Sequence, residues 1–107
     1  MAGRQGYLGE FEQVVLLAVA RLAEDAHGMR LRALIADRAG RDVTIGAMYA
    51  TLDRLVAKGY LRSRDDLDGR PRRFFALTAE GVRALEAVRA LQQRMWAGIR
   101  LPKASRR

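Results

Sequence analysis

The sequence predicts a mainly α-helical protein with one small β-hairpin. Apolar residues recur at helical spacing in three segments between residues 8 and 58. The pattern changes to that of two short strands between residues 60 and 77, and a long helical pattern then begins at residue 79. At 107 residues and with no cysteine, the chain fits one small domain without disulfides.

The first two predicted helices lie on either side of a polar break at residues 24–28. The first covers residues 8–23, and its apolar arc is so wide that the helix has to be covered on two sides. The second begins near Met29 and ends near Gly40, a residue type that commonly caps a helix C-terminus. The apolar sides of these two helices form part of the predicted core.

The third predicted helix covers residues 45–58. Thr44 is suited to be its N-cap, and Gly59 ends it. Its inward-facing side chains recur after four and three residues: Met48, Leu52 and Leu55. The opposite surface therefore faces outward.

A hairpin and a long helix complete the chain. Strands are expected at residues 60–64 and 73–77 around an Asp68-Gly69 turn. Thr78 then caps a helix from residue 79 to about 100, about 33 Å long. This order is that of a winged helix-turn-helix domain at 8–78, followed by a C-terminal dimerisation helix at 79–100. We expect residues 1–7 to be an N-terminal arm and residues 101–107 to be a basic disordered tail.

The charge indicates a polyanionic partner. Twenty Lys and Arg residues against twelve Asp and Glu residues give a net charge of +8. The outward surface of the third helix is mostly small near its N-terminus, so it could enter a DNA major groove about 12 Å wide, with Tyr49 donating to a phosphate. Alternatively, the small residues let another helix pack closely and Tyr49 is a half-buried core aromatic.

The hairpin adds five arginines near its turn: Arg62, Arg64, Arg70, Arg72 and Arg73. In a winged helix this loop lies along the duplex, where arginine contacts phosphates or the minor groove. Three nearby aspartates leave open that the segment is a solvated charged turn. The predicted DNA-binding residues are Thr44, Gly46, Ala47, Tyr49, Ala50, Asp53, Arg54, Arg70, Arg72 and Arg73.

The long helix predicts a two-fold dimer, because its apolar stripe exceeds what a small domain can cover. The alternative is that it folds back on its own domain. The predicted interface takes residues from the first and last helices: Leu8, Phe11, Val15, Leu85, Val88, Leu91, Met95, Trp96 and Ile99. Trp96 could stack on a planar apolar small molecule, or it could be ordinary interface packing.

An enzyme is not expected. His27 is the single histidine and reads as structural or exposed, and the acidic residues lack metal-ligand spacing. We therefore expect no catalytic residue, no metal and no cofactor. The apolar run at residues 14–20 is too short to span a bilayer, and no secretory signal opens the chain, so we expect a cytoplasmic protein.

Four blocks of the sequence also carry a resemblance. They are Leu8-Gly9-Glu10-Phe11-Glu12, His27-Gly28-Met29-Arg30-Leu31, the run 46–55 from Gly46 to Leu55, and Gly59-Tyr60-Leu61 with the run 72–81 from Arg72 to Gly81. In this order and at these separations they resemble the PadR family of bacterial transcriptional regulators, specifically its short members with one C-terminal helix.

The resemblance implies a homodimeric winged-helix protein that binds a pseudo-palindromic operator near its own or a neighbouring promoter, usually as a repressor relieved by a small molecule. It implies that Tyr49 contacts phosphate. Ala47, Ala50 and Met29 stand where the family usually has Thr, Pro and Tyr, so hydroxyl contacts at 47 and 29 are lost. The alternatives are a protein-interaction or ligand-sensing module without DNA activity, and a protein that binds structured RNA.

Overall fold

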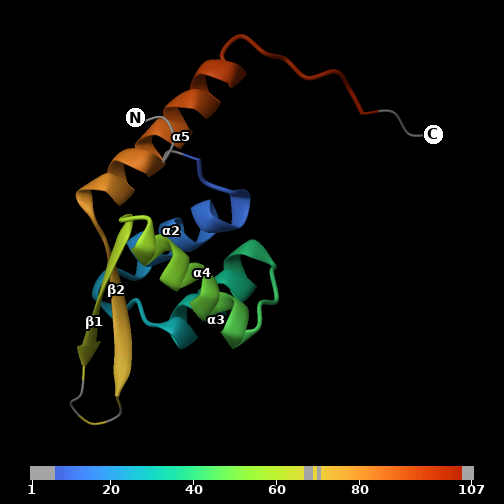
Figure 1. Cartoon of the computed structure of the whole chain (residues 1–107). Coiled ribbons are helices and arrows are strands. Elements are labelled where there is room, and N and C mark those ends of the chain that lie inside the picture. Colours follow the sequence, from blue (N-terminus) through green and yellow to red (C-terminus); the bar gives the residue numbers. More distant parts are fainter. Residues whose placement is uncertain (1–6, 67–68, 70, 105–107) are drawn as a thin grey trace.

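The computed structural model describes residues 7–66, 69 and 71–104 (Figure 1). The elements follow in the order α2 (Glu10–Leu22), a short 3-10 helix η1 (Ala23–Asp25), α3 (Gly28–Ala39), α4 (Ile45–Ala57), β1 (Leu61–Asp66), β2 (Arg72–Leu77) and α5 (Ala79–Trp96). The predicted class, mainly helical with one hairpin and a C-terminal helix, is confirmed.

The core lies between α2, α3, α4 and the base of the hairpin. Its fully buried side chains come from all of these elements, and the largest are Leu16, Leu31, Ile35, Met48, Leu52, Leu55 and Leu61. Burying a side chain of this size contributes roughly 1.5–3 kcal/mol. The inward positions predicted for the third helix are confirmed, so the outward surface of α4 is set by this packing.

The hairpin is longer than the sequence predicts. Its register runs from Leu61 opposite Leu77 to Asp66 opposite Arg72, so two aspartates expected in the turn belong to β1. They lie opposite arginines, and opposite charges on facing strand positions favour pairing. The backbone N–H of Phe75 donates to the carbonyl of Ala26 at 2.9 Å and thereby joins the hairpin to the helical body.

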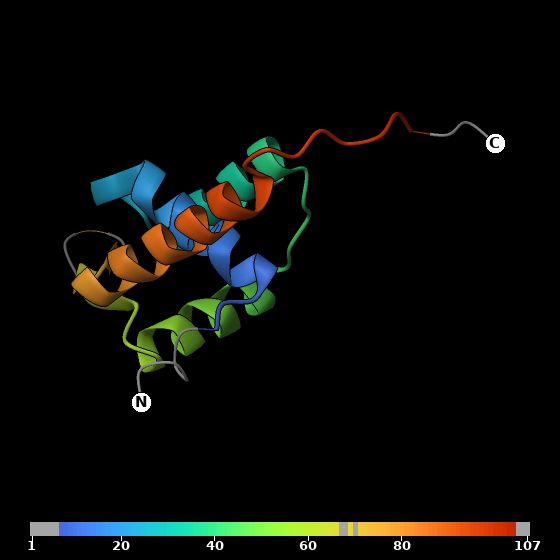
Figure 2. The same cartoon turned by 90° about the horizontal axis from the view of Figure 1, so that it is seen from above.

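Helix α5 begins with a close contact to the residues that follow α4, and it then extends away from the domain. The hydroxyl of Thr78 donates to the Gly59 carbonyl at 2.6 Å and accepts from the N–H of Gly81 at 3.0 Å. A Cβ on Gly81 would overlap the carbonyl oxygen of Tyr60, so this position requires glycine. From there α5 crosses over α2 and extends outward (Figure 2).

The expected end of α5 near residue 100 is wrong. The helix ends at Trp96, and Gly98 has a left-handed φ of 76°. The N–H of Ala97 donates to the Gln93 carbonyl at 3.0 Å, which closes the last turn. Ile99 therefore lies beyond the helix and does not continue its apolar stripe. None of the helices in the described ranges is long and apolar enough to cross a membrane.

Candidate nucleic-acid interface

The first two turns of α4 are exposed and carry mostly small side chains, and we call this surface the α4 tip. The side-chain oxygen of Thr44 accepts from the N–H of Ala47 at 3.0 Å, which confirms it as the N-cap. The exposed residues that follow are Ile45, Gly46, Ala47 and Ala50. No heavy atom would lie within 4 Å of a Cβ on Gly46. Because few side chains protrude here, the backbone of the α4 tip can come close to a binding partner.

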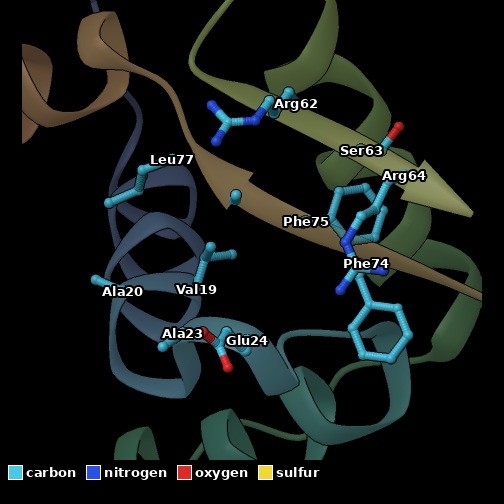
Figure 3. Close-up of a pocket in the computed structure, with 11 residues that line it drawn as sticks. Val19, Ala20, Ala23, Glu24, Arg62, Ser63, Arg64, Phe74, Phe75 and Leu77 are labelled. Carbon is cyan, nitrogen blue, oxygen red and sulfur yellow. The ribbon is translucent and has the colours of Figure 1, made fainter. Parts of the chain in front are cut away.

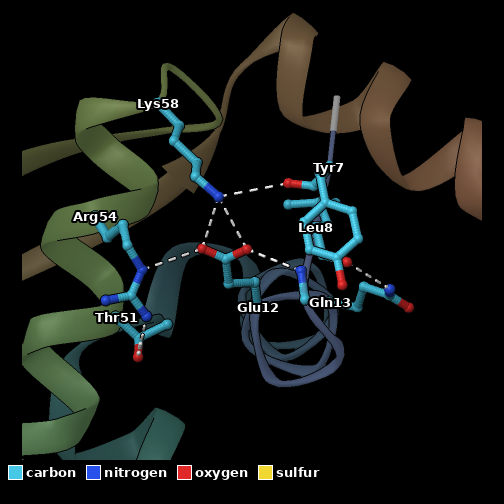
Figure 4. Close-up of polar contacts among 8 residues, drawn as sticks. Tyr7, Leu8, Glu12, Gln13, Thr51, Arg54 and Lys58 are labelled. Atoms are coloured by element: carbon cyan, nitrogen blue, oxygen red, sulfur yellow. Dashed lines mark hydrogen bonds and ion pairs between the residues drawn. The ribbon is translucent and has the colours of Figure 1, made fainter. Parts of the chain in front are cut away.

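A buried carboxylate fixes α4 against α2 (Figure 4). Glu12 accepts from the N–H of Gly9 at 2.9 Å, from Nε of Arg54 at 3.2 Å and from Nζ of Lys58 at 2.9 Å. Burial raises the pKa of Glu12, but the hydrogen bonds from Lys58, Gly9 and Arg54 together hold it below the ordinary value. Arg54, predicted to contact DNA, thus has a partner within the protein.

Sequence reasoning missed this cluster. Glu12 is forty-two residues from Arg54 and forty-six from Lys58. One signal is present in the sequence. Glu12 lies on the apolar side of the first predicted helix, and a buried carboxylate needs hydrogen-bonding partners elsewhere in the protein.

Tyr49 links α4 to the beginning of α3. It is half-buried, and its ring and hydroxyl lie against Gly28, where a Cβ would overlap them. The ring packs within the protein, as expected for a half-buried aromatic residue, and the hydroxyl lies at the first turn of α3. The phosphate contact of this hydroxyl stays a prediction.

An ion pair joins α4 to the hairpin. Nη1 of Arg73 donates to Oδ1 of Asp53 at 2.9 Å, and its Nη2 donates to the hydroxyl of Ser63 at 3.3 Å. The same guanidinium stacks 4.9 Å from the ring centroid of Phe75. Two predicted DNA-binding residues, Asp53 and Arg73, are therefore held to each other.

Arg72 is exposed and lies beside the first turn of α3. Its Nη1 is 3.1 Å from Nε2 of His27, whose ring meets Phe74 edge-on at 5.3 Å. Burial, and then the charge of Arg72, lower the pKa of His27 below 6.5, so the neutral ring can accept from Arg72. Arg70, also predicted to bind DNA, lies outside the described residues.

The strand alternation places Arg73 on one face of the hairpin and Arg62 and Arg64 on the other. Arg73 faces α4, and a hollow of about 360 Å³ between α4 and the hairpin is lined by Tyr49, Asp65, Pro71, Arg72 and Arg73. Arg62 and Arg64 line a separate cavity of about 430 Å³ toward α2 (Figure 3). The hairpin is therefore basic on both faces.

The predicted dimer residues fall into three groups. Leu8 and Val15 are buried in the protomer's own core, so they offer little side-chain surface to a second copy. Phe11, Leu85 and Val88 are half-buried against the core. Leu91, Met95, Trp96 and Ile99 are exposed, and Nε1 of Trp96 donates to Gln92 of the same helix at 3.1 Å.

The described residues contain no group of three or more His, Cys, Asp or Glu that could hold a metal ion.

Helices α3 and α4 form a helix-turn-helix beside an arginine-bearing β-hairpin, and together these elements define a winged-helix DNA-binding protein. Residues 16–87 match the model of the transcriptional regulator PadR-like family. The chain belongs to this family of DNA-binding transcriptional regulators, and it is not an enzyme.

Solved structures agree with this assignment. A PadR family transcriptional regulator from Eggerthella lenta is 32% identical, with a TM-score of 0.66, over 83% of this chain and 81% of its own. RosR from H. salinarum is 26% identical, with a TM-score of 0.73, over 87% of this chain and 81% of its own.

F93 from STIV, a winged-helix DNA-binding protein, shares the fold at 22% identity and a TM-score of 0.68, over 88% of this chain and 99% of its own. A search of the curated proteins found no match.

Proposed function

We propose that this regulator is a homodimer that binds a pseudo-palindromic operator and represses its own or a neighbouring operon. The observation that carries the proposal is the exposed, low tip of α4 beside a basic hairpin. The α4 tip of each copy enters one of two successive major grooves, about 34 Å apart, and the hairpin lies along the flanking backbone. Repression is then steric, because the bound dimer occupies promoter DNA.

The exposed apolar surface of α2 and α5 is suited to contact with a second copy of the chain. Every residue from Leu91 to Ala104 is exposed, and Met95 and Trp96 are 68% and 54% exposed. On α2, Leu17 is 52% exposed and lines an apolar groove with Val82 and other residues of α5. Two such surfaces related by a two-fold axis can cover each other, which a single protomer does not achieve.

A mobility-shift assay on the protein's own upstream region, against random duplex of equal length at near-physiological salt, tests operator binding. The proposal expects a discrete complex on the upstream DNA at a protein concentration that leaves random duplex free. Equal affinity for both would contradict sequence-specific binding. Retention of a protein partner with no DNA shift would support the interaction module instead.

The effector hypothesis rests on Trp96. An indole that is half exposed near the proposed dimer contact can stack on a planar apolar compound. Titration with such compounds should change Trp96 emission and release operator DNA together. Constant emission at high ligand concentration would count against an effector at this position.

A further inference from the structure

We infer that the protein reads base pairs through the C5-methyl groups of thymine, with Ile45, Ala47 and Ala50 as the contacting residues. The inference rests on the proposed operator binding and concerns how that operator is recognised. It is argued from two observations. The exposed side chains of the α4 tip are apolar, and the charged residues next to them are bound to other residues of the protein.

The tip carries methyl groups and almost no hydrogen-bonding atoms. Ile45 is 38% exposed, and Ala47 and Ala50 are exposed beside the open position of Gly46. None of these side chains contains nitrogen or oxygen. The hydroxyl oxygen of Thr44 accepts from the N–H of Ala47 and serves as the helix cap.

Asp53 and Arg54, farther along α4, bind other residues of the protein. Asp53 accepts from Arg73 at 2.9 Å. Arg54 donates to Glu12 at 3.2 Å and to Thr51 at 3.3 Å. The Tyr49 ring lies against Gly28.

Base pairs are usually distinguished in the major groove by side chains with two hydrogen-bonding atoms, such as arginine on guanine or asparagine on adenine. The tip offers no such group. The thymine methyl is the major-groove feature that apolar side chains recognise directly. Ile45, Ala47 and Ala50 are therefore suited to thymines spaced along one half-site.

Replacing thymine by deoxyuridine removes this methyl and leaves the base-pairing hydrogen bonds intact. The test uses the full chain and the upstream DNA region bound in the mobility-shift assay, with each thymine replaced in turn and Kd measured at one salt concentration. Burial of one methyl-sized group is worth about fourfold in Kd. The inference expects a loss of about this size at one or more positions in each half-site, and unchanged Kd at thymines outside them.

An Ile45→Ala variant then assigns the contact. If Ile45 covers a thymine methyl, the variant binds unmodified operator more weakly, and one deoxyuridine replacement that weakens the parent protein no longer weakens the variant. Tyr7→Ala is the control, because Tyr7 is an exposed residue that lies outside both α4 and the proposed dimer surface. It should leave the full deoxyuridine pattern in place.

The outcomes separate this inference from the proposed function. Specific binding to upstream DNA with no deoxyuridine effect at any position would overturn methyl readout and leave operator binding standing. Absence of any preference for the upstream DNA would overturn both.

Discussion

Arg73 and Arg72 are neighbours in sequence, but the structure separates their roles. Arg73 is half-buried and bound to Asp53, Ser63 and Phe75, whereas Arg72 is exposed beside His27. Arg73 thus orients the hairpin against α4, and we expect the exposed Arg72 to contact a phosphate.

This difference should appear in the salt dependence of operator binding. Arg72→Ala should make the log–log salt slope shallower by about 0.9, because one phosphate contact is lost. Arg73→Ala should weaken binding and leave the slope unchanged. The measurement is Kd by anisotropy at several salt concentrations. An equal loss of slope in both variants would show that Arg73 also contacts phosphate.

Gly28 is required by Tyr49, which the sequence motif alone does not reveal. Gly28→Ala should lower the free energy of unfolding by about 1–3 kcal/mol, because its Cβ would overlap the tyrosine ring. Gly46→Ala is the control, since nothing lies within 4 Å of its Cβ and alanine favours a helix by about 1 kcal/mol. Urea unfolding of both variants makes the comparison. Equal stability of the two would contradict the close packing of Tyr49 on Gly28.

At the scale of elements, Glu12 connects the helix proposed for dimerisation to the helix proposed for recognition. Its carboxylate holds α2 to α4 through Arg54 and Lys58. Replacing it by Gln keeps the shape and removes the charge, so Glu12→Gln should cost about 1–3 kcal/mol of stability at neutral pH.

This cost should depend on pH. The pKa of Glu12 is lowered in the folded protein, so its stabilisation is fully present above the ordinary value of 4.5 and is lost as the pH falls through the folded pKa. The unfolding free energies of wild type and Glu12→Gln should therefore converge below about pH 4.5. A difference that stays constant from pH 7 to pH 3 would show that the carboxylate charge is not what stabilises this contact.

Local patterns predicted most of the elements. Apolar spacing predicts the bounds of α3 and α4 to within a residue or two, and it predicts Thr44 and Thr78 as caps because capping chemistry is local. The apolar spacing predicts too long an α5, because the spacing continues to Ile99 although Gly98 turns the backbone before it. Contacts such as Asp53 with Arg73 were not predictable, because they depend on where the hairpin docks.

At the scale of the whole molecule, one protomer leaves the distal part of α5 uncovered. Leu91→Asp should shift the protein from dimer to monomer, because it places a charge in the proposed apolar contact. Folding should persist, since Leu91 is about half exposed in the protomer. Light scattering after size exclusion measures the mass, and circular dichroism measures the fold.

Gln93→Asp is the control for charge, because it places a carboxylate on the same helix, on the side opposite Leu91. This variant should remain dimeric. A Leu91→Asp protein that stays dimeric would show that α5 does not form the contact.

The proposed two-fold dimer also implies a fixed spacing of the DNA half-sites. Inserting five base pairs between the half-sites rotates one major groove to the opposite side of the duplex, about half a helical turn away. We expect this operator to bind at least about tenfold more weakly than the parent, because only one α4 can enter its groove and the gain from two linked contacts is lost. Unchanged affinity for the lengthened operator would contradict a dimer that places two recognition helices on one face of DNA.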